Sequence, residues 1–219
     1  MSISENLVNI LKSIPKLVTL VAVSKTKPNE AIIEAYNTGQ RVFGENKVQE
    51  LTAKHEALPK DIEWHMIGHL QTNKVKYIAP FVSLIHGIDS FKLLKEVNKR
   101  AKQNDRIIDC LLQIHIAQEQ SKFGFSNEEV SELLNSDEFK LLKNVRVIGL
   151  MGMATFTDNE AQIRKEFKTL KQLFDKLFSS NHQLSILSMG MSGDYKIAIE
   201  EGSSMIRVGS SIFGERNYN

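Results

Sequence analysis

The sequence contains a single cysteine, Cys110, among 219 residues. One cysteine cannot close a disulfide within the chain, which excludes a small disulfide-stapled secreted domain. Its apolar neighbours Ile107, Ile108, Leu111 and Leu112 indicate a thiol buried in a strand. We therefore expect a reducing, cytoplasmic compartment.

Long hydrophobic runs are also missing. No apolar stretch approaches the ~20 residues that a membrane-spanning helix requires, so we expect no membrane segment. The segment from Met1 to Pro15 has no basic region followed by an apolar core, which argues against a secretory signal peptide. The net charge is only +2 and no basic run stands out, so we expect no nucleic-acid surface.

No linker, low-complexity segment or internal repeat divides the chain, and we expect residues 1–219 to form one domain. Strand-like and helix-like segments alternate along it. Strands are predicted at 20–25, 41–46, 63–68, 83–88, 107–116, 145–151, 184–189 and 204–208. Helices are predicted at 3–14, 29–38, 47–58, 72–79, 91–103, 127–136, 159–178 and 194–201.

This alternation is typical of a parallel sheet with crossover helices. Eight such units in a chain of 219 residues favour an α/β fold that is a single (β/α)8 TIM-type barrel, with the helix at 3–14 leading it. A doubly wound open sheet is the competing architecture. It is disfavoured because no glycine loop has the dinucleotide-binding pattern G-x-G-x-x-G.

The first predicted strand ends in Ser24 and Lys25, shortly before Pro28. A lysine at the mouth of a buried strand is well placed for chemistry, since partial desolvation makes an amine a better nucleophile toward an aldehyde. A solvated strand-end lysine is the alternative interpretation. The nearby Lys27 directly precedes the proline, and we expect it near the rim of the barrel and in solvent.

Two turns of small residues follow the seventh and eighth predicted strands. The first contains Ser192 and Gly193, and the second contains Gly209 and Ser210. Such turns expose backbone N–H groups and hydroxyls beside a helix N-terminus, which is the chemistry of a phosphate site, and barrels commonly bind phosphate at these positions. Ordinary entry into a helix is the alternative for each turn taken alone.

A nucleophilic lysine and a phosphate cradle together indicate pyridoxal 5'-phosphate (PLP). Its aldehyde would form a Schiff base with Lys25. Arg207 ends the eighth strand beside the cradle and could donate to the pyridine nitrogen, which would keep that nitrogen unprotonated and weaken the ring as an electron sink. Asn46, after the second strand, could reach the ring or could cap a helix.

The histidines give no comparable signal. His65 and His69 have the i, i+4 spacing of a metal site on a helix, but a strand and Gly68 occupy this stretch, so we expect no metal site. His86 and His115 are expected to be packed or hydrogen-bonded strand residues.

Six stretches carry a resemblance that extends over nearly the whole chain. They are VAVSKTKP at 21–28, FGEN at 43–46, WHMIGHLQTNK at 64–74, GLMGMA at 149–154, LSMGMSGD at 187–194 and RVGSSIFG at 207–214. In this order they make the chain similar to the pyridoxal phosphate homeostasis protein family.

The resemblance implies a single-domain barrel like the N-terminal domain of alanine racemase, without that enzyme's second domain. It implies an internal aldimine on Lys25, a pyridine contact at Arg207, and phosphate contacts at Ser192, Gly193, Gly209 and Ser210. It also implies that the protein buffers and delivers PLP and maintains intracellular vitamin B6 and amino-acid homeostasis, with no established enzymatic activity. PLP-dependent apoenzymes would then be its partners.

The chain departs from the family pattern at three positions. Gly152 stands where a cysteine is frequent, Ser210 where a threonine is frequent, and Lys47 where an aromatic residue is frequent. Ser210 keeps the hydroxyl for phosphate binding, whereas Lys47 could alter the rim and cofactor exchange. Nothing in the sequence demands an oligomer, and we expect a monomer.

Two other functions share part of this pattern. An amino-acid racemase using PLP would need an acid or base on both faces of the substrate Cα. Lys25 could serve one face, and Tyr195 is the tyrosine nearest the cradle in sequence, although packing at the start of a helix is its expected role. An aldolase-type barrel would form a Schiff base with a sugar phosphate through the same lysine.

Overall fold

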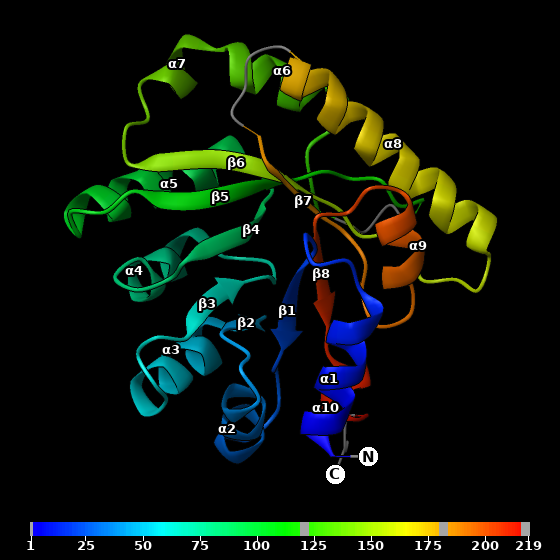
Figure 1. Ribbon diagram of the computed structural model, residues 1–219. Coiled ribbons are helices and arrows are strands. Elements are labelled where there is room, and N and C mark those ends of the chain that lie inside the picture. Colours follow the sequence, from blue (N-terminus) through cyan, green and yellow to red (C-terminus); the bar gives the residue numbers. More distant parts are fainter. Residues whose placement is uncertain (1, 119–122, 180–183, 216–219) are drawn as a thin grey trace.

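Eight parallel strands form a closed barrel in the computed structural model, in the order β1 to β8 with β1 also pairing with β8 (Figure 1). The structure describes residues 2–118, 123–179 and 184–215. The strands are β1 (Thr19–Val23), β2 (Val42–Glu45), β3 (Glu63–Met66), β4 (Leu84–Ile88), β5 (Ile108–Gln113), β6 (Val145–Met151), β7 (Ile186–Ser188) and β8 (Met205–Val208). The predicted (β/α)8 barrel is therefore confirmed, and the open sheet is excluded.

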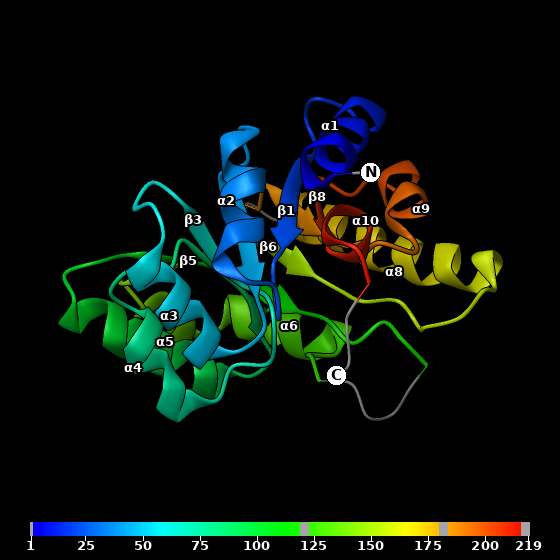
Figure 2. The same ribbon diagram turned by 90° about the horizontal axis from the view of Figure 1, so that it is seen from below.

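Helices surround the barrel and connect each strand to the next (Figures 1 and 2). They are α1 (Ile3–Ser13), α2 (Asn29–Asn37), α3 (Val48–Ala57), the 3₁₀ turn η1 (Thr72–Lys74), α4 (Val75–Ile78), α5 (Phe91–Gln103), α6 (Asn127–Asn135), α7 (Asp137–Lys140), α8 (Glu160–Ser179), α9 (Tyr195–Glu200) and α10 (Ser210–Phe213). None of these described helices is both long and apolar enough to cross a membrane.

The leading helix α1 closes the fold against the chain's other end. Its apolar residues Leu7 and Ile10 are buried, and a capping box at Ser2 and Glu5 starts it. Asn6 donates a hydrogen bond of 3.1 Å to the carbonyl of Ile212, so α1 lies beside α10 (Figure 1).

Side-chain alternation along each strand produces two apolar layers. One set of residues fills the inside of the barrel, where Val21, Leu84, Leu111, Met151 and Met205 form a buried cluster. The other set faces outward and packs against the helices in a larger cluster. The same alternation continues past the strand ends, so it decides which polar residues enter the mouth of the barrel and which lie behind it.

Two short helices differ from the prediction. The helix at 127–136 ends at Asn135, and Ser136 caps a separate short helix, α7, with its hydroxyl accepting from the Phe139 N–H at 3.2 Å. Helix α10 consists of four residues, too short to produce a periodic pattern.

The strand predicted at 107–116 ends at Gln113 in the structure. The segment between it and the helix predicted at 127–136 lies partly outside the described residues.

Candidate functional site

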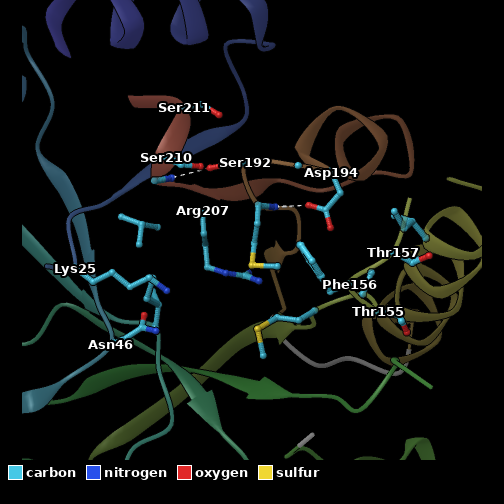
Figure 3. A pocket seen from close by; sticks show the side chains of 18 of the residues that line it. Lys25, Asn46, Thr155, Phe156, Thr157, Ser192, Asp194, Arg207, Ser210 and Ser211 are labelled. Atoms are coloured by element: carbon cyan, nitrogen blue, oxygen red, sulfur yellow. Dashed lines mark hydrogen bonds between the residues drawn. The ribbon is translucent and has the colours of Figure 1, made fainter. Parts of the chain in front are cut away.

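A cavity of about 610 Å³ opens at the carboxyl ends of the strands, on the face where barrels carry their sites (Figure 3). It brings together every predicted site residue. Its lining includes Lys25, Asn46, Ser192, Gly193, Arg207, Gly209 and Ser210, together with Val23, Lys27, Ile67, Met153, Ala154, Thr155, Phe156, Thr157, Asp158, Ile163, Met191, Asp194, Ser211 and Gly214.

Lys25 lies in a tight turn directly after β1, and its side chain is half-buried. Together with Val21 and Val23, it shares the alternation that faces the barrel interior. The following residue, Thr26, has a left-handed φ of +63°. Figure 3 shows the side chains of Lys25 and Asn46 beside one another at one side of the cavity. Asn46 is not the cap of α3, which begins after Lys47.

The two small-residue turns form one cradle. Because β7 pairs with β8, the turns that follow these strands meet, and the Gly209 N–H donates to Ser192 Oγ at 3.1 Å (Figure 3). A Cβ at Gly209 would lie 3.2 Å from the Val23 carbonyl oxygen, so this turn also packs against the end of β1. Gly193 faces open space. The cradle therefore presents hydroxyls and backbone N–H groups next to the strand that carries Lys25.

Arg207 lies on β8 between the cradle and the barrel floor, and only 4% of its surface is exposed. Its Nη1 donates to the Ser188 carbonyl at 2.9 Å and to Ser188 Oγ at 2.7 Å, and its Nη2 donates to the Gly152 carbonyl at 3.0 Å. Burial lowers the pKa of Arg207 to about 10, against the opposite effect of the Asp194 carboxylate. The guanidinium is therefore a fixed cation at neutral pH, held from beneath and open to the cavity (Figure 3).

A buried chain of side chains continues from Arg207 into the barrel. Ser188 Oγ lies 3.1 Å from His86 Nδ1, and His86 Nε2 lies 3.1 Å from His65 Nδ1. Since Arg207 donates to Ser188 Oγ, the hydroxyl proton can go to His86, which then donates to His65. Burial lowers the pKa of His65 to about 3 and that of His86 well below its ordinary value. Both rings are thus neutral at pH 7.

We expect this pair to make the protein sensitive to mild acid. In the unfolded chain both histidines bind protons as the pH falls through about 6.5, whereas in the native chain they stay neutral. Protonation therefore favours the unfolded chain, and the free energy of unfolding decreases as the pH falls below about 6.5. Between pH 7 and pH 5 the free energy of unfolding should fall by about 2 kcal/mol for each histidine that stays neutral. Urea titrations across this range measure it. In His65→Gln the slope should be shallower, and an equal slope in both proteins would show that His65 does not contribute.

Lys27 corrects one expectation. It lies at the rim of the cavity, as predicted, but it is half-buried rather than solvated. Its Nζ donates to the carbonyls of Phe213, Gly214 and Glu215 at 2.9, 3.1 and 3.0 Å. Lys27 therefore binds the carbonyls at the C-terminal end of α10 and just after it.

The two other departures from the family pattern lie outside the cavity. Lys47 is exposed next to Asn46 and does not line the cavity. A Cβ at Gly152 would meet Leu170 at 2.7 Å and Ile116 at 2.9 Å, so this position faces the helix layer. Only the Gly152 carbonyl, through Arg207, reaches the site.

The prediction that His86 and His115 are packed or hydrogen-bonded is confirmed, since His86 is fully buried and His115 Nε2 lies 2.8 Å from the Ala117 carbonyl oxygen. His69 Nδ1 pairs with Asp89 at 2.9 Å, while His65 points into the barrel toward His86. Within the described ranges, no group of three His, Cys, Asp or Glu is arranged to hold a metal ion. Cys110 is fully buried, and burial raises the pKa of its thiol. Tyr195 begins α9 and packs against the outer apolar layer.

The sequence did not reveal the contribution of the β6–α8 connection. Thr155, Phe156, Thr157 and Asp158 line the far side of the cavity, and Phe156 is 95% exposed (Figure 3). Glu166 on α8 holds this connection by accepting from the Thr155 N–H at 2.7 Å and the Thr155 hydroxyl at 2.8 Å. Their position after the sixth predicted strand could have placed these four residues at the site, because barrels carry their sites at that end of the strands. Their residue types, however, match no sequence motif.

Fold and site together define a cofactor-binding barrel of the alanine racemase type. A family model described as "Alanine racemase, N-terminal domain" matches residues 1–217. The pyridoxal phosphate homeostasis protein of Aquifex aeolicus is 46% identical over 91% of this chain and 87% of its own length. That of Vibrio alginolyticus is 42% identical over 94% of this chain and 89% of its own length. The chain belongs to the pyridoxal phosphate homeostasis protein family.

Solved structures agree with this assignment. PipY of Synechococcus elongatus, with PLP bound, is 35% identical with a TM-score of 0.88, covering 97% of this chain and 100% of PipY. The alanine racemase of Clostridium difficile is 15% identical with a TM-score of 0.81, covering all of this chain but 57% of the racemase. At that identity the racemase shows the fold alone. The more similar relatives carry the name of a homeostasis protein rather than of an enzyme.

Proposed function

We propose that this protein binds PLP as an internal aldimine on Lys25 and serves as a carrier that buffers the cofactor and delivers it to apoenzymes. One observation carries the proposal. A lysine amine, a two-turn cradle and a buried guanidinium, drawn from opposite ends of the chain, open onto a single cavity of about 610 Å³. These are the three groups that an aldehyde, a phosphate and a pyridine nitrogen require.

Each part of the site has its own task. Lys25 Nζ would condense with the aldehyde carbon, forming a C=N bond and releasing one water molecule. Ser192, Gly193, Gly209 and Ser210 would donate hydroxyl and backbone N–H groups to the phosphate. Arg207 would donate to the pyridine nitrogen. Because its cation is held by two carbonyls and a hydroxyl, it would keep that nitrogen unprotonated.

The lining favours a carrier over a racemase. A racemase needs a second acid or base opposite the lysine, and Tyr195, the tyrosine considered for that role, is not among the described residues that line the cavity. Tyr195 packs in the helix layer instead. The names of the relatives, which describe homeostasis of pyridoxal phosphate, support the same role.

We propose that residues 1–219 act as one domain and that the protein is a cytoplasmic monomer.

The first test is chemical trapping in the wild-type protein. Mixing it with PLP should produce an absorption band in the near ultraviolet or visible, and borohydride should fix the cofactor to the peptide that contains Lys25, as read by mass spectrometry. A yellow colour in freshly purified protein would argue against the aldolase-type alternative. Failure to form an adduct, or an adduct on another peptide only, would contradict the proposal.

The carrier role has a separate test. The purified, loaded protein should catalyse no sustained exchange of deuterium at the Cα of a panel of amino acids. Sustained turnover of any of them would restore the racemase as the better description, while leaving the Schiff base on Lys25 intact.

A further inference from the structure

A buried cluster of charged side chains lies behind Lys25, on the outer face of the barrel. Ser24 and Glu45, at the ends of β1 and β2, point away from the cavity toward α3, where Glu50 and Lys54 meet them. Lys54 Nζ contacts Glu45 Oε1 at 2.8 Å and Glu50 Oε1 at 2.6 Å. Ser24 Oγ donates to Glu45 Oε1 at 2.6 Å.

Ordinary packing does not require this cluster. Glu45 is fully buried and Lys54 is 5% exposed, and desolvating such charges costs stability that their attraction only partly returns. Burial raises the pKa of Glu45 against the effect of Lys54, and Glu45 Oε2 has no hydrogen-bond partner. Apolar side chains would fill the space between strand and helix at lower cost. A charged cluster kept here points to a role beyond filling volume.

The cluster holds the backbone on both sides of Lys25. Before it, Lys54 Nζ donates to the Ser24 carbonyl at 2.8 Å. After it, the Thr26 N–H donates to Glu50 Oε1 at 2.6 Å. Thr26 is the residue with a φ of +63°, a conformation that a residue with a Cβ adopts at a cost. Glu50 and Lys54 are one turn apart on α3 and paired with each other, so they act as one unit.

We propose that Glu50 and Lys54, the Glu50–Lys54 clamp, are positioning residues that hold the turn of Lys25 so that its amine is presented to the aldehyde of the cofactor. The inference rests on the proposed function, since it concerns the same lysine. The clamp adds that the reactivity of Lys25 is controlled from outside the barrel by α3, a helix that does not line the cavity. A small displacement of a reacting group is enough to slow a reaction by one or two orders of magnitude.

Glu50→Ala is the principal variant. It removes the acceptor of the Thr26 N–H while the buried pair of Lys54 and Glu45 stays intact, so the fold should persist. We expect the adduct with PLP to form about tenfold more slowly than in the wild type. The rate is measured from the rise of the absorption band and from the amount of borohydride-reduced adduct that mass spectrometry detects over time. Hydrogen exchange at the Thr26 amide should become faster.

Two further variants separate positioning from general damage. Glu50→Gln keeps an oxygen that can accept from the Thr26 N–H, and its rate should lie between those of the wild type and Glu50→Ala. Glu56→Ala removes an exposed carboxylate from the same helix and should react at the wild-type rate. The same ratio of rates should appear with pyridoxal, which lacks the phosphate, because the clamp acts on Lys25 and not on the cradle.

The outcomes distinguish the two proposals. If the wild type forms no adduct on Lys25, the proposed function fails and the inference fails with it. If the wild type reacts and Glu50→Ala reacts equally fast, the function stands and the clamp is overturned. A rate loss in Glu56→Ala as large as that in Glu50→Ala, or a loss with PLP but not with pyridoxal, would also overturn it. The double variant Lys54→Met with Glu45→Gln, which leaves no buried unpaired charge at Glu45, should be slow as well, and a wild-type rate there would contradict the proposal.

Discussion

Replacing Lys25 with alanine should abolish the borohydride-trapped adduct and weaken the binding of PLP by at least about 100-fold. The proposed covalent bond would be the only attachment lost, because the cradle and Arg207 come from β7, β8 and the turns that follow them. The remaining contacts are non-covalent, and a 100-fold loss corresponds to about 2.7 kcal/mol. Trapping followed by mass spectrometry and a titration of the absorption band measure the two effects.

The matched control is Lys47→Ala, which removes another lysine close to the site but outside the cavity. It should retain the adduct on Lys25 and bind PLP within about twofold of the wild type, since its side chain is exposed. Lys25→Ala should also unfold at nearly the wild-type urea concentration because Lys25 is half-buried. An adduct that moved to Lys27 in Lys25→Ala would show that Lys27 can replace it and would refute the expected loss.

Replacing Arg207 with leucine should have the largest effect on stability. The guanidinium donates three buried hydrogen bonds, to the Ser188 carbonyl, Ser188 Oγ and the Gly152 carbonyl. Leucine donates none, and each of these three lost bonds is worth about 1 kcal/mol, so the free energy of unfolding should fall by roughly 3 kcal/mol, although Ser188 keeps the Gly152 N–H on its carbonyl and His86 on its hydroxyl. Urea unfolding measures this loss directly.

Arg207→Lys provides the comparison. An ammonium keeps the charge but cannot reproduce the forked geometry that reaches β7 and the end of β6 together, so we expect an intermediate stability. In both variants the absorption band of bound PLP should shift, because the proposed function places Arg207 against the pyridine nitrogen and both variants change that group. A leucine variant as stable as the wild type, with an unshifted band, would show that Arg207 neither supports the barrel floor nor contacts the cofactor.

Much of the site followed from local sequence. The small residues around Ser192 and Gly209 mark turns, and the strand before Lys25 is apolar and rich in β-branched residues. Turn chemistry and side-chain alternation act over a few neighbouring residues, so they can be read without a structure. The eight alternating strand and helix segments indicate a barrel, and in a barrel the carboxyl ends of all the parallel strands lie on one face.

Other features depend on contacts between distant segments. Glu50 reaches the Thr26 N–H from α3, and Arg207 on β8 reaches past β7 to the Gly152 carbonyl after β6. Lys27 closes α10 instead of lying in solvent. In each case a long side chain bonds to a backbone group, and backbone groups are the same in every residue. No residue type in the sequence identifies such a partner.

Periodicity and the residue types near one another in the chain are enough to specify the class of fold, the strand ends and the chemical character of the site. How the site is held depends on tertiary contacts. Closure of the barrel pairs β1 with β8, places the Lys25 turn beside the cradle, and brings α3 against the outer face of that turn. Those contacts depend on the register and packing of the whole barrel, which local patterns do not specify.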